Sequence, residues 1–136
     1  DYYFNLDPVR IPQKYPNKKY YKGPKKGQLS CNPNGKSPGD CWDMPNVKHN
    51  HCEKTGHPCQ FPIQLVSRLI LSMTRPGDVV FDPYIGSGTT AISAVMNDRL
   101  CVGVDREESY LSIAVDRLKK LYAGELKIRN GIMKDE

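Results

Sequence analysis

A short glycine-containing loop is the part of this sequence whose residue types and spacing most directly indicate chemistry. The segment Gly86-Ser-Gly88-Thr-Thr-Ala91 fits the pattern G-x-G-x-x-G/A and follows a short apolar run. Asp105, nineteen residues after Gly86, ends the next apolar run. In nucleotide-binding folds the glycines let the backbone approach the ligand, and the later carboxylate accepts hydrogen bonds from ribose hydroxyls. The spacing therefore predicts a nucleotide-binding loop, with a tight turn that binds nothing as the alternative.

The residue that opens this loop, Asp82, indicates which nucleotide is bound. Its carboxylate would repel the pyrophosphate of a dinucleotide by a few kcal/mol at an effective dielectric constant of ~20. The same charge would attract a ligand that carries an ammonium and a sulfonium group. S-adenosylmethionine carries both, so Asp82 favours this cofactor over a dinucleotide such as NAD. A Rossmann-type enzyme that uses a dinucleotide remains the alternative.

The elements that must hold these residues follow from hydrophobic spacing. Helices are expected over residues 62–73, 89–97 and 107–122, and buried strands over residues 79–81 and 100–104. The residues expected to face inward from the first and third helices are Leu65, Val66, Leu69, Ile70 and Met73, and Leu111, Ala114, Val115, Leu118 and Leu121. This order of elements predicts an α/β fold with parallel strands. Two strands are too few for a stable open sheet, so we expect only part of one.

Two motifs in the chain resemble those of a known enzyme family. The segment Asp82-Pro-Tyr-Ile-Gly-Ser-Gly-Thr-Thr90 resembles the first, cofactor-binding motif of DNA amino-methyltransferases, which make N6-methyladenine or N4-methylcytosine. His57-Pro-Cys-Gln-Phe-Pro62 resembles the motif that precedes it in the circularly permuted order of the beta group. The resemblance covers roughly residues 30–122. It implies a partial Rossmann-like methyltransferase sheet, preceded by part of the DNA-recognition region.

The resemblance also implies a role for each motif residue. The loop that begins at Asp82 would hold the methionine part of S-adenosylmethionine, Asp105 its ribose, and the segment from His57 to Pro62 the far side of the methionine pocket. The implied cofactor-binding residues are His57, Cys59, Gln60, Asp82, Pro83, Tyr84, Gly86, Ser87, Gly88, Thr89, Thr90 and Asp105. The implied reaction is methyl transfer to the exocyclic amino group of an adenine or a cytosine flipped out of duplex DNA.

The motif that carries the chemistry in this family is not found in the sequence. In that motif an acidic or polar residue, two prolines and an aromatic residue bind the target amine and stack on the flipped base. The nearest segment, Asp7-Pro-Val-Arg10, lacks the second proline and the aromatic residue. In the permuted order the motif would precede residue 1, so we expect the chain to be inactive alone. Its expected partner is the N-terminal catalytic half, on the same longer chain or as a separate subunit.

Residues 1–56 are expected to form a loop-rich basic segment, and residues 57–136 the cofactor-binding α/β region. Residues 1–60 hold ten basic and five acidic residues with eight of the eleven prolines, whereas residues 61–136 hold ten of each charge. Lysines neutralise phosphates and tyrosines stack on bases, so the basic segment is interpreted as part of the target-recognition region for duplex DNA. The expected DNA contacts are Lys18, Lys19, Tyr20, Lys22, Lys25, Lys26, Lys36 and Lys48. A solvated arm and a non-catalytic DNA-binding remnant are the alternatives.

Composition disfavours several other classes of protein. No apolar run is long enough to span a membrane, and no leader typical of secretion opens the chain. The five cysteines lack disulfide-like spacing, which favours a location in the reducing cytoplasm. The family resemblance implies that the protein is bacterial or phage-encoded. His49, His51 and Cys52, followed by His57 and Cys59, lack the usual spacing of zinc ligands, so no metal site is expected.

Overall fold

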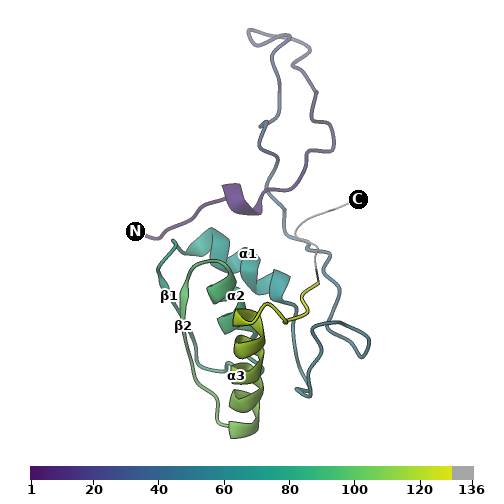
Figure 1. The fold of residues 1–136 in the computed structure, drawn as a ribbon. Coiled ribbons are helices and arrows are strands. Elements are labelled where there is room, and N and C mark those ends of the chain that lie inside the picture. Colours follow the sequence, from purple (N-terminus) through teal and green to yellow (C-terminus); the bar gives the residue numbers. More distant parts are fainter. Residues whose placement is uncertain (130–136) are drawn as a thin grey trace.

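Regular structure is concentrated in the second half of the chain, as hydrophobic spacing predicts. The computed structural model describes residues 1–129 (Figure 1). Its elements are the short 3-10 helix η1 (Asp7–Val9), α1 (Ile63–Met73), β1 (Val79–Asp82), α2 (Thr89–Met96), β2 (Leu100–Gly103) and α3 (Glu108–Tyr122). The predicted order of three helices and two strands is confirmed. Residues 130–136, the end of the expected α/β region, lie outside the described part.

The two strands pair in parallel, which confirms the expected sheet. Val79 pairs with Leu100, and Asp82 pairs with Gly103. The carboxyl ends of both strands therefore lie at the same end of the sheet. Beyond the strands, the Ile85 N–H donates to the Val104 carbonyl at 2.9 Å, which holds the loop after β1 against the segment after β2.

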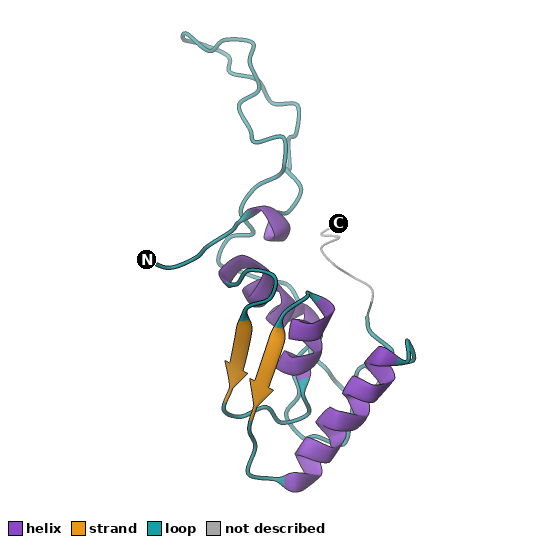
Figure 2. Ribbon diagram, turned by 60° about the vertical axis from the view of Figure 1, so that its left-hand side comes forward, coloured by secondary structure: helices purple, strands orange, loops and turns teal. Residues whose placement is uncertain are grey.

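The helices cover one side of this sheet (Figure 2). Helix α2 contacts both strands and lies between α1 and α3. The core between α1, α2 and the strands consists of Val66, Ile70, Ala94, Val80 and Cys101. Cys101 thus packs in the core. Burial raises the pKa of its thiol, and the nearby negative charge of Asp82 raises it further by a smaller amount.

The expectation of two buried strands was wrong, because no further layer covers the face of the sheet opposite the helices in the described residues, and Val79, Phe81, Leu100 and Val102 are exposed there. Three helix residues expected to face inward are exposed as well. Leu69 and Met73 of α1 are 41% and 58% exposed, and Val115 of α3 is 51% exposed. These expectations were wrong because α1 packs on α2 through the face that carries Val66 and Ile70, and η1 packs on α1 as well. In α3 the buried positions are those of Ala114 and Arg117, so the helix is rotated relative to the stripe that its apolar residues define.

The first sixty residues are loop-rich, as predicted, and they divide into a packed part and a projecting part. Near the start of the chain, the Asn5 N–H donates to the Ser72 carbonyl of α1 at 2.8 Å. The guanidinium of Arg68 lies 4.8 Å from the centre of the Trp42 ring, so Trp42 packs against α1. Between these contacts, residues 12–35 form an arm that projects away from the helices (Figure 1). In residues 1–129 no helix is long and apolar enough to cross a bilayer.

Candidate functional site

Asp82 ends β1, and its carboxylate organises the loop that follows. Its Oδ1 accepts a hydrogen bond from the Tyr84 backbone N–H at 2.9 Å, and its Oδ2 accepts one from the Thr90 hydroxyl at 2.6 Å. Within the part of the chain that the structure describes, no basic side chain forms an ion pair with Asp82. Its negative charge is therefore available to a cationic ligand.

The two glycines of the loop are required by conformation and by close packing. Gly86 and Gly88 have φ angles of 49° and 79°, in the left-handed region that other residues rarely adopt. A Cβ atom on Gly86 would lie 3.1 Å from Nε2 of His57, and one on Gly88 would lie 2.7 Å from Cβ of Ala114. The loop is thus held between the His57 segment and α3.

Asp105 follows β2 and is joined to the glycine loop by hydrogen bonds. Its Oδ2 accepts from the Gly86 N–H at 2.9 Å, and its Oδ1 accepts from the Glu107 N–H at 2.9 Å. The N–H groups of Glu107 and Gly86 stabilise the charged carboxylate, and they lower the pKa of Asp105 below its ordinary value. Each carboxylate oxygen has a second lone pair, so Asp105 retains the capacity to accept hydrogen bonds from ribose hydroxyls.

The His57 segment lies against the glycine loop, on the side opposite α3. The His57 ring packs edge-on against the Tyr110 ring of α3, with ring centres 4.3 Å apart. Its Nδ1 accepts a hydrogen bond from the Cys59 N–H at 3.2 Å, which fixes the ring beside Gly86. The structure therefore brings His57 and Asp105, which are distant in the sequence, to the loop that begins at Asp82 and contains Gly86.

Other predicted site residues divide into exposed and inward-facing groups. Tyr84 is 86% exposed, and Pro83 and Cys59 are also exposed. Gln60 is buried: its Oε1 accepts from the Thr55 N–H and hydroxyl, and its Nε2 donates to the Glu53 carbonyl. Gln60 thus fixes the segment that carries His57, and its predicted contact with the cofactor remains a prediction.

Ser87 and Thr89 face the body of the protein, where they meet a residue that the sequence analysis missed. Nη1 of Arg117 donates to the Ser87 carbonyl at 2.6 Å, and it lies 3.3 Å from both Ser87 Oγ and Thr89 Oγ1. The one signal in the sequence was a charged residue three positions after Ala114, on the buried side of α3. Arginine is rarely buried without a partner, so its position pointed to an acceptor nearby.

Comparison with known proteins shows which family the chain belongs to. The model of the N6/N4 DNA methylase family matches residues 1–116. The chain belongs to this DNA methylase family. It is 54% identical over 114 residues to the type II methyltransferase M.BglII of Bacillus subtilis, with 84% of this chain and 32% of that protein covered. It is 45% identical over 124 residues to M.ScaI of Streptomyces caespitosus, covering 88% and 39%.

Other members of the methylase family show the same partial coverage. The chain is 32% identical over 118 residues to the DNA adenine methyltransferase YhdJ of Escherichia coli, covering 87% of the chain and 40% of that protein. A solved structure, the M1.HpyAVI–SAM complex, is 36% identical with a TM-score of 0.44, covering 45% and 32%. The chain thus spans between about a third and two fifths of the length of these curated methylases.

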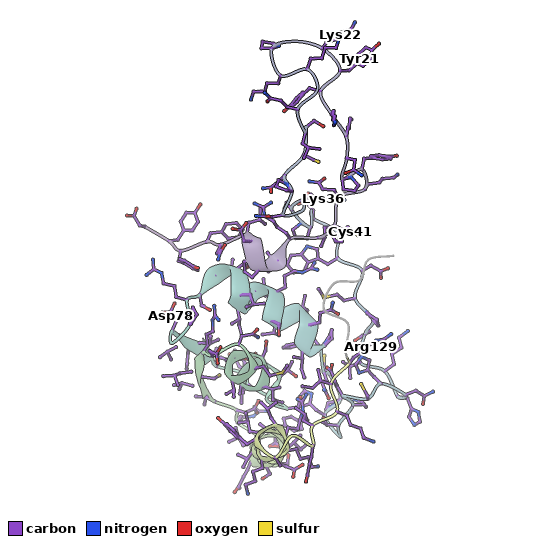
Figure 3. All side chains as sticks on the ribbon, turned by 45° about the horizontal axis from the view of Figure 1, so that its top comes forward. Tyr21, Lys22, Lys36, Cys41, Asp78 and Arg129 are labelled. Carbon is purple, nitrogen blue, oxygen red and sulfur yellow. The ribbon has the colours of Figure 1, made fainter. Side chains whose placement is uncertain are left out.

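The arm of this methylase chain gathers most of the predicted DNA-binding lysines on a projecting, exposed segment. From Pro8 to Gly39 the sequence contains eight basic residues and no acidic residue. Figure 3 shows Tyr21 and Lys22 at the far end of the arm and Lys36 at its base. Lys18, Lys19, Tyr20, Lys25 and Lys26 are also exposed on the arm, whereas Lys48 lies outside it. In residues 1–129 no group of three or more His, Cys, Asp or Glu side chains is placed to hold a metal ion.

Proposed function

We propose that the protein carrying this chain is a DNA methyltransferase that uses S-adenosylmethionine to methylate the exocyclic amino group of adenine or cytosine in duplex DNA. The chain would supply the cofactor cleft and part of the DNA-recognition region. The observation that carries the proposal is the convergence of Asp82, Gly86, Asp105 and His57 on one loop, in a chain that belongs to the DNA methylase family. This arrangement places the negative charge of Asp82, which has no ion-pair partner among the described residues, at the start of the glycine loop.

The charges and hydrogen-bond acceptors of these residues support S-adenosylmethionine as the ligand of the proposed site. Asp82 would attract the ammonium and sulfonium charges, Asp105 would accept hydrogen bonds from the ribose hydroxyls, and His57 would bound the far side of the methionine pocket. Tyr84, Pro83 and Cys59, which are exposed, would contact the cofactor around these anchors. When bound, the cofactor supplies an electrophilic methyl group. The residues of this chain bind and orient it.

The methyl-accepting chemistry would come from outside this chain. The sequence contains no Asp/Asn/Ser-Pro-Pro-aromatic motif, and the chain covers 32% of M.BglII. We therefore propose that the remaining length of the protein, or a separate subunit, supplies the residues that accept hydrogen bonds from the target amine. On this proposal the chain binds cofactor but does not methylate DNA alone.

The uncovered side of the sheet supports such a partner region. Val79, Phe81, Leu100 and Val102 are 59%, 63%, 62% and 53% exposed, and they all lie on the side of the sheet opposite the helices. Soluble proteins rarely leave a contiguous apolar face of this kind in water. A two-stranded sheet is also marginal without further strands or a covering layer. The proposed catalytic half would cover this face and extend the sheet.

The arm is proposed as a DNA-contacting element. Its lysines carry the charge needed to neutralise phosphates, and Tyr20 and Tyr21 are exposed at its far end. No acidic side chain on the arm opposes this charge. The reading of a particular DNA sequence would involve the arm together with the segment that returns to Trp42.

An amide NMR titration of the chain tests the cofactor proposal. Addition of S-adenosylmethionine is expected to shift the signals of residues 82–90 and of Asp105, whereas NAD is expected to leave them unchanged. A folded chain that ignores S-adenosylmethionine, or that responds to NAD, would contradict the proposal. A second assay tests whether the rest of the protein supplies the catalytic residues. The full-length protein is expected to transfer a labelled methyl group from S-adenosylmethionine to DNA, and residues 1–136 alone are expected not to.

A further inference from the structure

Three residues on one face of α3 contact the glycine loop and the segment that carries His57. Tyr110, Ala114 and Arg117 are spaced four and three residues apart, so they lie on the same side of the helix. Tyr110 contacts the ring of His57, Ala114 lies directly beneath Gly88, and Arg117 binds the Ser87 carbonyl. Helix α3 therefore supports both the His57 segment and the glycine loop.

Arg117 makes the strongest of these contacts. Its side chain is only 3% exposed, and its Nη1 has three oxygen acceptors from Ser87 and Thr89. A hydrogen bond from a charged donor is stronger than a neutral one. The Ser87 carbonyl therefore points toward α3, and the same peptide unit is fixed at its other end because the Gly88 N–H donates to the Ile85 carbonyl at 2.9 Å.

Glu53 is the buried acidic residue that complements this arginine. It is 5% exposed, and both residues line one cavity of about 680 Å³ between α3 and the segment around Lys54. Burial lowers the pKa of Arg117, and the negative charge of Glu53 counteracts that effect. The two oppositely charged side chains therefore line the same cavity, although they do not form a direct ion pair.

Glu53 in turn anchors the segment that carries His57. Its Oε2 accepts from the Ile63 N–H at the start of α1 at 3.1 Å, and its backbone carbonyl accepts from Nε2 of Gln60 at 2.7 Å. Its Oε1 accepts from the Arg129 N–H at 3.2 Å. Residues 53–63 are thus fixed around one buried carboxylate.

We propose that Arg117 is a positioning residue for the cofactor cleft: it fixes the Ser87 carbonyl from beneath the loop and, through its attraction to Glu53, links the glycine loop to the segment that carries His57. The inference rests on the proposed function, because the cleft it positions is the proposed S-adenosylmethionine site. Arg117 itself does not touch the ligand. Its effect on binding is exerted through the backbone of the loop.

The test compares Arg117→Met, Arg117→Lys and the control Lys119→Met in the full-length protein. Lys119 is an exposed cation two residues further along α3, so its replacement removes the same charge without touching the loop. We expect Arg117→Met to weaken S-adenosylmethionine binding by at least about tenfold, the size expected for one lost charge-assisted hydrogen bond. Arg117→Lys should restore part of the affinity, and Lys119→Met should change it less than about twofold. A folded Arg117→Met protein with unchanged affinity would overturn the proposal.

A spectroscopic signal separates this inference from the proposed function. The carbonyl ¹³C shift of Ser87 and the amide ¹⁵N shift of Gly88 report on the hydrogen bond from Arg117, even without cofactor. Arg117→Met should move both signals and Lys119→Met should move neither. If the unsubstituted protein binds no S-adenosylmethionine, the proposed function fails, but the Ser87 shift still tests the contact.

The link to Glu53 is tested by a double-mutant cycle. We expect Glu53→Gln and Arg117→Met, each of which removes one of the two charges, to have non-additive effects on cofactor affinity, because the two charges act through each other. Glu53→Gln retains the shape of the side chain and an oxygen acceptor, so it also serves if Arg117→Met does not fold. Strictly additive effects would overturn the link between the two walls of the cleft.

Discussion

At the scale of single residues, we propose that the charge of Asp82 selects the cofactor. The Asp82→Asn substitution retains an oxygen acceptor for the Tyr84 N–H and a polar group beside Thr90, whose hydroxyl can reverse its role. It removes only the negative charge. We therefore expect the dissociation constant for S-adenosylmethionine, measured by calorimetry, to rise by about tenfold or more with little change in stability.

The control for this prediction is Asp98→Asn. Asp98 is exposed and follows α2 with a φ angle of 61°, a conformation that asparagine adopts as readily as aspartate. The control removes the same charge from a position outside the cleft, and cofactor affinity should stay within about twofold. Equal effects of the two substitutions would mean that Asp82 acts only through the net charge of the protein.

The hydrogen bonds to Asp105 make a second prediction at this scale, about pH. The pKa of Asp105 is lowered in the folded protein, so its stabilising effect is present above the unfolded value of about 3.9 and is lost as the pH falls through the lower folded value. The amide proton shifts of Gly86 and Glu107 should therefore titrate with a midpoint below about pH 3.9. In Asp105→Asn this titration should disappear; a midpoint above pH 3.9 would contradict the assigned hydrogen bonds.

At the scale of elements, the contact between the glycine loop and α3 leaves no space for a side chain. A Cβ on Gly88 would lie 2.7 Å from Cβ and 2.9 Å from Cα of Ala114, whereas one on Gly124 would meet nothing within 4 Å. Both glycines have positive φ angles, 79° and 72°, so substitution by alanine strains both backbones alike. Gly88→Ala should lower the free energy of unfolding by roughly 1–3 kcal/mol more than Gly124→Ala, the usual cost of overpacking. Urea denaturation of the two variants measures this difference.

The sequence was sufficient to predict the elements, but not every face that they bury. The strands and helices follow from short-range patterns, because apolar spacing and turn residues act over a few positions. Which face of a helix is buried depends on its neighbours: Leu69 and Met73 satisfy the helical spacing of α1, yet η1 and α2 cover other positions. The exposed Val115 and the buried Arg117 have the same origin in the packing of α3.

The candidate site was predictable to the same extent. Asp82 and Asp105 end parallel strands, and that topology alone brings their loops to one end of the sheet. The approach of His57 to Gly86 followed only from a family resemblance. The contact of Arg117 with Ser87 joins residues thirty positions apart through side-chain packing, which no local spacing encodes.

At the scale of the whole molecule, positive charge is concentrated on the arm, whereas residues 61–136 hold equal numbers of basic and acidic residues. Replacement of Lys22, Lys25 and Lys26 by glutamine should weaken DNA binding. For each phosphate contact that is lost, one counterion fewer is released from the DNA when the protein binds. The slope of log affinity against log salt concentration should fall by about one for each such contact. Fluorescence anisotropy over a salt series measures both quantities.

The matched control replaces Lys119, Lys120 and Lys127 by glutamine. These residues are exposed and carry the same total charge, but they belong to α3 and the segment after it. Their replacement should leave the salt slope nearly unchanged. Equal slopes for the two triple variants would show that the arm has no special role in DNA contact.

The arm differs from the rest of the molecule in having no core of its own. Its residues from Lys14 to Leu29 are all exposed, and its shape depends on turns and on backbone bonds such as that from the Tyr20 N–H to the Gln28 carbonyl. Substitutions there remove little buried area, so they cost the α/β region little stability. The arm is therefore the part of the protein that can accumulate mutations, or be exchanged for another loop, without loss of the cofactor cleft. On the proposed role of the arm in DNA contact, evolution and protein engineering could alter target choice there while the remainder stays fixed.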